Sequence, residues 1–212
     1  QPEDYREVEE VAREAFWNFY APGCDEHYLL HIMRSSPNFV KGLDFVAVAD
    51  RKIVGIVVFL KSFILTDDGC KYEVLSMGPI AVLPQYQRMG IGRMLIAHTR
   101  KIAAEMGYRT ILLCGEPRYY SKVGFEAAEH FNIRTSEDKY FAALHVCPLY
   151  PDALAGVSGR YYEDVIYNTD SDKAKEFDKL FPRKEHIEGT SSQKRFEEVL
   201  AMQKNYKSSS DK

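Results

Sequence analysis

The stretch from Lys71 to Gly92 constrains the fold more than any other part of the chain. Its first part, as far as Val82, is an extended run that is interrupted at Gly78-Pro79. A loop follows, and then a helix that is recognisable from apolar residues at a spacing of three to four. These apolar residues are Ile91, Met94, Leu95, Ile102 and Met106. The stretch therefore predicts a strand, a loop and a helix in direct succession.

The point where the strand gives way to the helix has the composition of an anion site. Gly90 and Gly92 lie there, and glycines allow a ligand to approach the backbone closely. The first N–H groups of a helix lack intrahelical partners and carry partial positive charge, so they bind anions. Arg88 and Arg93 add positive charge beside the same turn. We therefore expect this loop to hold phosphate groups.

Two common phosphate-binding loops do not fit this segment. A Rossmann fingerprint needs a third glycine and a Walker loop needs Gly-Lys-Ser/Thr, whereas Gly92 is followed by Arg93-Met94-Leu95. The segment Gln87-Arg88-Met89-Gly90-Ile91-Gly92 instead resembles the Gln/Arg-x-x-Gly-x-Gly/Ala motif of the GNAT superfamily of N-acetyltransferases. In that family the amides of this loop hold the pyrophosphate of coenzyme A.

A second segment, at the expected distance, supports the resemblance. The run from Gly115 to Phe125 is similar to the GNAT pattern aromatic-Tyr-x-x-x-Gly-Phe. Within it, Pro117 suits the first turn of a short helix and Gly124 suits its left-handed cap. The two motifs occur in the right order and at the right spacing, which supports the resemblance. It covers residues 45–125 well.

The runs around these motifs indicate a mixed sheet. Phe45–Ala49 and Lys52–Leu60 are joined by Asp50-Arg51 and have the pattern of a hairpin. Thr110–Cys114 is a continuous apolar run, which suits a strand that is buried on both faces and parallel to the strand before the helix. Together with the resemblance, this implies the GNAT fold. That α/β fold has a mixed, mostly antiparallel central sheet with a splayed parallel strand pair, flanked by helices.

The ends of the chain lie outside the motifs. Asp4 can cap a first helix, and a second helix is expected at about Asp25 to Ser35. We place a GNAT domain at residues 1–150 and a C-terminal extension, which is expected to pack on the core, at residues 151–212. The extension is predicted to contain one strand and two helices, at Arg160–Tyr167, Asp172–Phe181 and Thr190–Lys204. Residues after Ser208 are expected to be disordered.

Composition argues against several functional classes. The chain of 212 residues has a formal net charge of −3, whereas a general nucleic-acid binder is usually strongly basic. No apolar run approaches the roughly 20 residues that span a membrane, and no signal peptide is recognisable. Cys114 and Cys147 fall within apolar runs and are expected to be buried thiols. We therefore expect a cytoplasmic protein with no nucleic-acid or membrane partner.

The resemblance also implies which residues bind acetyl-CoA, the cosubstrate of the family. The backbone at the end of the organising strand would pair with the pantetheine arm, and the loop after it would hold the pyrophosphate. The residues implied are Ile80, Ala81 and Val82 for the first contact, and Gln87, Arg88, Met89, Gly90, Ile91, Gly92 and Arg93 for the second.

Tyr119 and Tyr120 must be assigned to different roles. On a helix, Tyr119 shares a face with Val123 and is expected to be core, whereas Tyr120 lies about 100° around the axis. The general acid of the family maps onto Tyr120. A phenol, with a pKa near 10, is a suitable donor for a departing thiolate, with a pKa near 8.5. The alternative is that Tyr120 only packs against the thioester.

The general base is less well defined by the sequence. Some GNAT enzymes use a glutamate on the central strand, and the corresponding position here holds Ser76. Glu73 lies three residues earlier and is our candidate, although a solvated surface carboxylate is the simpler reading. Glu116 is closer to Tyr120 in the sequence, and its simpler reading is a cap of the short helix. A chain of water molecules would need neither carboxylate.

The histidines do not form a metal-binding pattern. His27 and His31 share a helix face but no third ligand is suggested, so we expect them at the acceptor entrance or on the surface and expect no metal. The acidic residues of the first helix are expected to form a solvated face; they are Glu3, Asp4, Glu7, Glu9, Glu10 and Glu14.

The function expected is acetyl-CoA-dependent N-acetyl transfer, in which an amine attacks the thioester directly. The acceptor, a small-molecule or peptide amine, is left open, as is a homodimer. The alternatives are a non-catalytic acyl-CoA-binding module, which would lack turnover, and a protein-interaction module whose active part is the C-terminal extension.

Overall fold

The computed structural model describes residues 1–206, and their contacts divide the chain into two compact units. Unit 1 comprises Gln1–Leu60, Met77–Thr99 and Asp164–Phe196. Unit 2 comprises Lys61–Ser76, Arg100–Glu163 and the described residues from Glu197 onward. The disorder expected after Ser208 concerns residues outside the described part of the chain.

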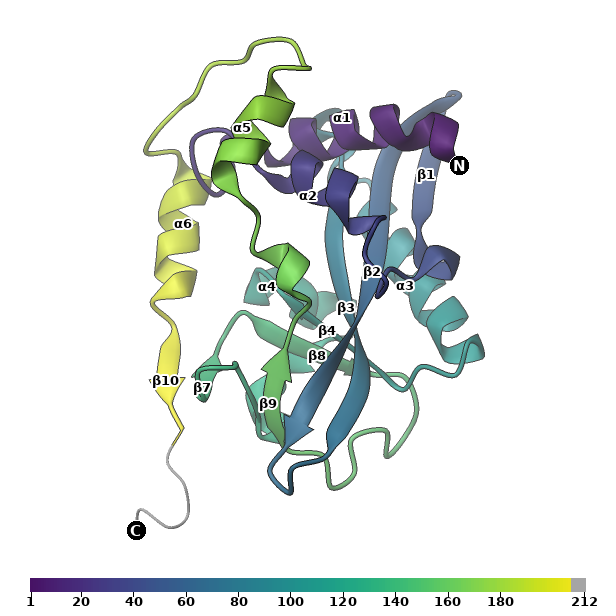
Figure 1. Ribbon diagram of the computed structural model, residues 1–212, viewed down its shortest axis with the longest axis vertical. Coiled ribbons are helices and arrows are strands. Elements are labelled where there is room, and N and C mark those ends of the chain that lie inside the picture. Colours follow the sequence, from purple (N-terminus) through teal and green to yellow (C-terminus); the bar gives the residue numbers. More distant parts are fainter. Residues whose placement is uncertain (207–212) are drawn as a thin grey trace. The chain divides into compact units, whose positions relative to one another are not determined.

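Figure 1 labels the elements along the chain. The helices are α1 (Tyr5–Phe16), α2 (Glu26–Met33), α3 (Ile91–Glu105), α4 (Pro117–Tyr120), α5 (Ser171–Asp178) and α6 (Ser191–Leu200). The first strands are β1 (Phe45–Ala49), β2 (Lys52–Thr66), β3 (Lys71–Val82), β4 (Thr110–Cys114) and β5 (Glu126–Ala127). The remaining strands are β6 (Ile133–Arg134), β7 (Lys139–Phe141), β8 (Leu144–Pro148), β9 (Gly159–Tyr162) and β10 (Gln203–Asn205).

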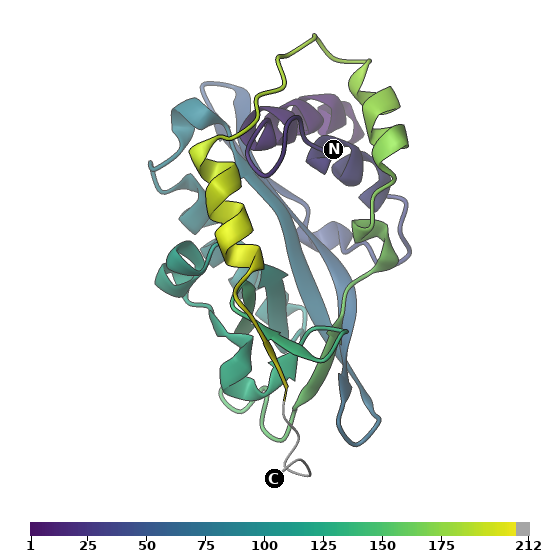
Figure 2. The same ribbon diagram turned by 90° about the vertical axis from the view of Figure 1, so that its left-hand side faces the viewer.

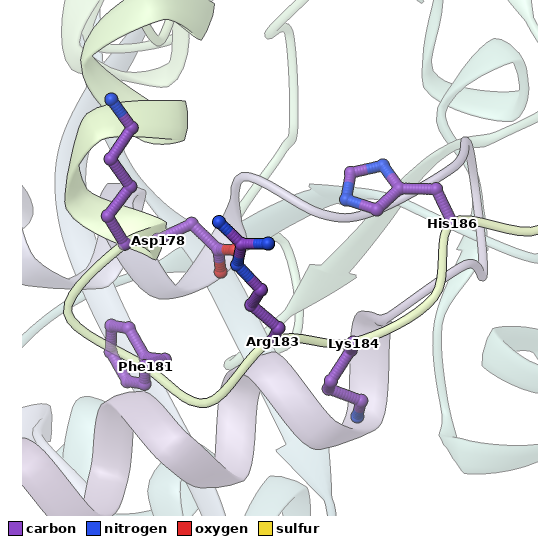
Figure 3. Close-up of a pocket in the computed structure, with 6 residues that line it drawn as sticks. Asp178, Phe181, Arg183, Lys184 and His186 are labelled. Carbon is purple, nitrogen blue, oxygen red and sulfur yellow. The ribbon is translucent and has the colours of Figure 1, made fainter.

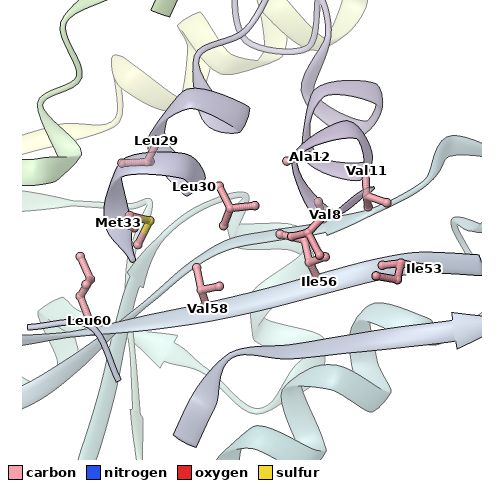
Figure 4. Close-up of a cluster of buried hydrophobic side chains, with 11 residues drawn as sticks. Val8, Val11, Ala12, Leu29, Leu30, Met33, Ile53, Ile56, Val58 and Leu60 are labelled. Atoms are coloured by element: carbon pink, nitrogen blue, oxygen red, sulfur yellow. The ribbon is translucent and has the colours of Figure 1, made fainter. Parts of the chain in front are cut away.

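Unit 1 contains the predicted hairpin and the N-terminal helices. β1 pairs antiparallel with β2, and the turn residues Asp50 and Arg51 have φ angles of 48° and 64°, so the hairpin prediction is confirmed. Apolar side chains of α1 and α2 pack on β2 (Figure 4). The fully buried members of this cluster include Val8, Leu30 and Ile56. This packing explains why short helices of modest propensity are stable here.

The last segment of unit 1 returns to the N-terminal helices. α5 lies beside α2 (Figure 2), and the ring of Phe177 is 5.5 Å from that of His27. Arg13 of α1 donates through Nε to Asp178 Oδ1 of α5 at 2.6 Å. Because the Arg13 side chain is only 2% exposed, this ion pair is buried on the arginine side. It fixes the end of α5 against α1.

Unit 2 contains the parallel strand pair. The sheet order is β5-β8-β4-β3-β2-β9-β6, in which β2 and β3 are the strands that also extend into unit 1. β3 and β4 pair in parallel, with Leu75 opposite Ile111, and β4 and β8 pair antiparallel. This mixed sheet with helices confirms the predicted fold class. It also confirms the strand–loop–helix–strand unit predicted from Lys71 to Cys114.

Some predicted details of the elements are wrong. Met94 of α3 and Met106, which follows the helix, are 61% and 47% exposed. Ile91 and Leu95 are buried as predicted, and the other buried residues of the helix are Ile96, Thr99 and Ala103. A three-to-four spacing is compatible with two adjacent stripes of a helix. The stripe that is buried includes a threonine and an alanine, and a search for strongly apolar residues does not pick out either of them. Thr99 is satisfied there because its Oγ1 donates to the carbonyl of Leu95 at 2.8 Å.

The elements after residue 150 are shorter than predicted. The strand expected at Arg160–Tyr167 is β9, Gly159–Tyr162, and a turn of 3-10 helix follows at Val165–Tyr167. Asp164 causes the change, because its carboxylate accepts a hydrogen bond from the N–H of Ile166 and caps that turn. The last predicted helix ends at Leu200, and β10 then pairs with β7.

Candidate active site

In unit 1, the loop before α3 has the backbone geometry of an anion cradle. Arg88 and Gly90 have φ angles of 63° and 88°, and α3 begins at Ile91. The carbonyl of Gly90 accepts the N–H of Met94 at 3.0 Å, so the first N–H groups of the helix have no intrahelical acceptor. A side chain added at Gly90 would meet nothing within 4 Å. The space beside this backbone is therefore open to a ligand.

The side chains around the loop leave its positive charge available. Gln87, Arg88, Met89 and Arg93 are exposed. None of the ion pairs found among residues 1–206 involves Arg88 or Arg93. Gln87 has a different task, since its Nε2 donates to the carbonyl of Val82 at 3.0 Å and ties the loop to the end of β3. The residues present therefore fit a pyrophosphate.

The predicted pantetheine contacts lie at the end of the same strand. Ala81 is 3% exposed and packs in the core, so its side chain is not available for binding. The peptide bond between Gly78 and Pro79 is cis. The carbonyl of Gly78 accepts a hydrogen bond from the Tyr167 hydroxyl at 3.0 Å. The structure thus brings all ten predicted coenzyme A residues into unit 1, in the continuous segments Ile80–Val82 and Gln87–Arg93.

In unit 2, the predicted acid Tyr120 has a closely packed ring. The ring occupies the space where a side chain at Gly115 would be, because a Cβ built there would lie 2.1 Å from Tyr120 Cε2. The rings of Phe125 and His145 each lie 5.7 Å from it, centre to centre. Glu116 caps α4 by accepting the N–H of Arg118 at 3.1 Å, which confirms the simpler reading of that carboxylate. Packing against Gly115, Phe125 and His145 therefore fixes the Tyr120 ring.

The prediction that Tyr119 is a core residue is wrong. Its side chain is 40% exposed, and its ring contacts that of Tyr120 at 5.1 Å between centres. α4 is only four residues long and gives way to a 3-10 helix at Ser121–Val123. The spacing that would place Tyr119 over Val123 on a continuous α-helix therefore does not apply.

His145 of β8 is a neutral neighbour of Tyr120. It is 3% exposed, and burial lowers the pKa of its imidazole more than nearby backbone groups of Glu126 and Gly115 raise it. A neutral ring is therefore expected beside Tyr120 at physiological pH. Sequence reasoning did not identify this contact, because the pairing of β8 with β4 was not predictable from local pattern.

The candidate base Glu73 lies on the surface of unit 2. Its side chain is 59% exposed, and Oε2 lies 3.4 Å from Lys61 Nζ. Ser76, at the position of the usual base, is only 2% exposed. The Ser76 hydroxyl is hydrogen-bonded to Ser62 Oγ at 2.5 Å and to the hydroxyl of Tyr161. Ser76 is therefore part of a buried hydroxyl chain.

Burial alters the acidity of several groups, which the sequence pattern did not indicate. Cys114, which we expected to be buried, is exposed because it is the last residue of β4, whereas Cys147 is buried as predicted. Protein atoms packed around Cys114 nevertheless raise the pKa of its thiol by desolvation, and the charge of Glu163 raises it further. Desolvation also raises the pKa of the Glu163 carboxyl. In unit 1, burial raises the pKa of Glu26 to about 7.

The histidines and acidic residues of unit 1 also differ from expectation. His27 is fully buried and His31, 53% exposed, bonds through Nδ1 to Glu9 at 2.8 Å. Glu9 itself is only 5% exposed and is not part of a solvated face. Burial lowers the pKa of His27 to about 4, which outweighs the opposite effect of Asp178, so the ring is neutral. No cluster able to hold a metal ion occurs among residues 1–206.

A cavity of about 430 Å³ in unit 1 lies along the segment after α5 (Figure 3). It is lined by Asp178, Lys179, Phe181, Arg183, Lys184 and His186. Asp178 is already bound by Arg13, and Lys184 Nζ donates to Glu14 at 2.8 Å. None of the predicted site residues lines this cavity.

Comparison with known proteins identifies the family. The family model for the acetyltransferase (GNAT) domain matches residues 42–127. The Escherichia coli protein described as the uncharacterized N-acetyltransferase YhbS is 32% identical over 157 residues, which cover 68% of this chain and 91% of YhbS. The described helices include none long and apolar enough to cross a membrane.

Solved structures share the fold. The crystal structure of YhbS from Escherichia coli in complex with CoA superposes with a TM-score of 0.70 at 28% identity, covering 80% of this chain and 89% of that one. A GNAT family acetyltransferase from Brucella melitensis in complex with acetyl-CoA has a TM-score of 0.63 at 23% identity, covering 79% and 94%. The α/β fold and the cradle before α3 define an acyltransferase of this type. The chain belongs to the GNAT superfamily of N-acetyltransferases.

Proposed function

We propose that an acceptor amine attacks the thioester directly and that Tyr120 protonates the departing thiolate. The overall reaction is the transfer of an acetyl group from acetyl-CoA to an amine, the activity of the family. A C–N bond forms at the carbonyl carbon, the C–S bond breaks, and the phenolic proton moves to sulfur. The observation that supports the proposal best is the open, positively charged loop Gln87–Arg93 at the start of α3.

The remaining assignments stay predictions. Glu73 remains a candidate for the general base, although its pairing with Lys61 gives it no particular support. We also propose that residues 151–212 form an extension to a GNAT domain at residues 1–150. A cytoplasmic location is a further prediction, and so is a homodimer. Light scattering on the purified protein would measure its mass in solution and so distinguish a monomer from a dimer.

A thiol-release assay tests the proposed function. Acetyl-CoA would be supplied with a polyamine, an aminoglycoside, an amino acid and a peptide with a free N-terminus, and free thiol would be recorded over time. We expect at least one amine to raise the rate of thiol release well above hydrolysis. Calorimetry would measure acetyl-CoA binding in parallel. Binding without turnover of any amine would instead identify an acyl-CoA-binding module without catalytic activity.

A further inference from the structure

One face of the sheet in unit 2 carries a chain of hydroxyl groups. Tyr161 of β9 lies opposite Ile64 of β2, so Ser62, two residues from Ile64, faces the same side. The hydrogen bonds of Ser76 with Ser62 and with Tyr161 confirm that the three side chains meet on this face. β2, β3 and β9 each contribute one hydroxyl.

The same face ends at Cys114. Ser76 of β3 lies opposite Leu112 of β4, and Leu112 belongs to the buried cluster that includes Tyr161. Cys114 follows Leu112 by two residues on the same strand and therefore faces the same side. It is the last residue of β4, the strand parallel to β3, and it is exposed. The carboxyl end of this parallel strand is thus open to a ligand on this face.

Glu163 reaches this face from β9. It directly follows the strand, two residues after Tyr161, so strand alternation directs its side chain to the side of Tyr161 and Cys114. Desolvation raises the pKa of the Cys114 thiol, and the negative charge of Glu163 raises it further. Glu163 is also exposed. Its accessible carboxylate and the accessible end of β4 therefore lie on the same face of the sheet, with β3 and β2 between the two strands.

We propose that Glu163 is the general base that receives the proton of the acceptor amine. As the amine nitrogen forms its bond to the carbonyl carbon, its proton passes to the Glu163 carboxylate. The C–S bond breaks and the thiolate takes the phenolic proton of Tyr120. Both residues then exchange protons with water, so atoms and charge balance over the cycle. This inference rests on the proposed function.

The surroundings of Glu163 suit this role better than those of the other carboxylates. Glu73 is paired with Lys61 and Glu116 caps α4. None of the ion pairs found among residues 1–206 involves Glu163. The raised pKa of its carboxyl brings it closer to the working pH, where a general base is most effective. The titratable groups on the same face of these strands are Cys114 of β4 and Tyr161 of β9.

A pH–rate profile tests the role. With the best amine from the thiol-release panel, Glu163→Gln should lower kcat by roughly 10²-fold or more and remove the acid limb of the profile. That limb should be present in the wild type, because a protonated carboxyl cannot accept the proton. Glu137→Gln, an exposed carboxylate of unit 2 bonded to Ser136, is the matched control and should behave as the wild type. Glu163→Gln with full kcat and an intact acid limb would overturn the proposal.

Alkylation of Cys114 tests the placement of Glu163 without any acceptor. Removing the negative charge lowers the pKa of the thiol, so Glu163→Gln should make iodoacetamide react severalfold faster at Cys114 at a fixed pH. Mass spectrometry of the Cys114 peptide gives the rate. The exposed Cys70 in the same chain and the Glu137→Gln variant should show no change. An unchanged rate at Cys114 would also overturn the proposal.

Other outcomes separate this inference from the function beneath it. If Glu73→Gln or Glu26→Gln removes the acid limb while Glu163→Gln keeps it, the base is assigned wrongly but the enzyme is an acetyltransferase. If the wild type binds acetyl-CoA and turns over no amine in the panel, the proposed function fails and the role of Glu163 fails with it.

Discussion

Tyr120 and Tyr119 differ in what surrounds their rings, and this difference predicts different effects of the same substitution. Tyr120→Phe keeps the ring that packs on Gly115 and His145 and removes only the hydroxyl. If that hydroxyl is the proton donor, kcat should fall by roughly 10²-fold or more with little change in acetyl-CoA affinity. Steady-state kinetics and calorimetry measure the two quantities. The alkaline limb of the kcat profile should also move or disappear.

Tyr119→Phe is the matched control for this prediction. Tyr119 is 40% exposed, so loss of its hydroxyl should leave kcat within severalfold of the wild type. Full kcat in Tyr120→Phe together with a loss in Tyr119→Phe would reverse the assignment. Full wild-type activity in both variants would mean that the thiolate leaves without a proton from either tyrosine.

At the same scale, the sequence did not predict how exposed several site residues are. Cys114 belongs to an apolar run and was therefore expected to be buried. It is the last residue of that run, and its thiol is accessible. Glu163 gave no signal at all, because its position depends on the pairing of β9 with β2, whose paired residues lie about a hundred positions apart in the sequence. Local pattern identifies a candidate by its neighbours along the chain, and these residues are defined by neighbours in space.

At the scale of elements, the loop before α3 makes a testable site. Gly90→Val places a side chain in the open space beside the backbone, at a φ angle of 88° that a β-branched residue rarely adopts. We expect the dissociation constant of acetyl-CoA to rise at least tenfold, which corresponds to about 1.4 kcal/mol. Calorimetry on the folded variant measures this.

The chain offers a control with the same backbone strain. Gly69 lies in the turn before β3, has a φ angle of 87° and would also meet nothing within 4 Å. Gly69→Val should therefore lose comparable stability but bind acetyl-CoA as the wild type does. If both variants lose affinity equally, strain rather than access explains the effect, and the loop is not the cradle.

Elements with strong local signals were predicted best. The hairpin at Asp50-Arg51, the left-handed cap at Gly124 and the parallel pair β3 and β4 all appear as expected. The strands after Phe125 have two to five residues each, which is too few for a periodic pattern. Their positions are set by pairing with distant strands, so the sequence indicated them only loosely.

For the whole molecule, the buried His27 predicts how stability depends on pH. Its pKa is about 4 in the folded protein and 6.5 in the unfolded chain. Between these values the unfolded state binds a proton that the folded state does not, so the free energy of unfolding should fall as pH falls from 6.5 to 4. The loss reaches about 3 kcal/mol at the lower end. Urea unfolding at several pH values measures it.

The variant His27→Gln isolates this contribution. In this variant the number of protons taken up on unfolding between pH 4 and 6.5 should fall by about one. The slope of the unfolding free energy against pH should fall accordingly, whatever the effect of the substitution on stability at pH 7. His130→Gln is the control, since that ring is 67% exposed and pairs with Glu126 on the surface. If His27→Gln leaves the slope unchanged, His27 is not the residue that titrates on unfolding.

The order of the chain in unit 1 has a consequence for synthesis on the ribosome. Arg13 leaves the ribosome well before its partner Asp178, which lies 165 residues further along the chain. At about 5–20 residues per second, roughly 8 to 33 s pass before that carboxylate is made. During this time α1 and α2 can pack on β2, but the guanidinium has no carboxylate from α5 to neutralise it. The N-terminal helices of the nascent chain therefore cannot reach their final arrangement until α5 has been made.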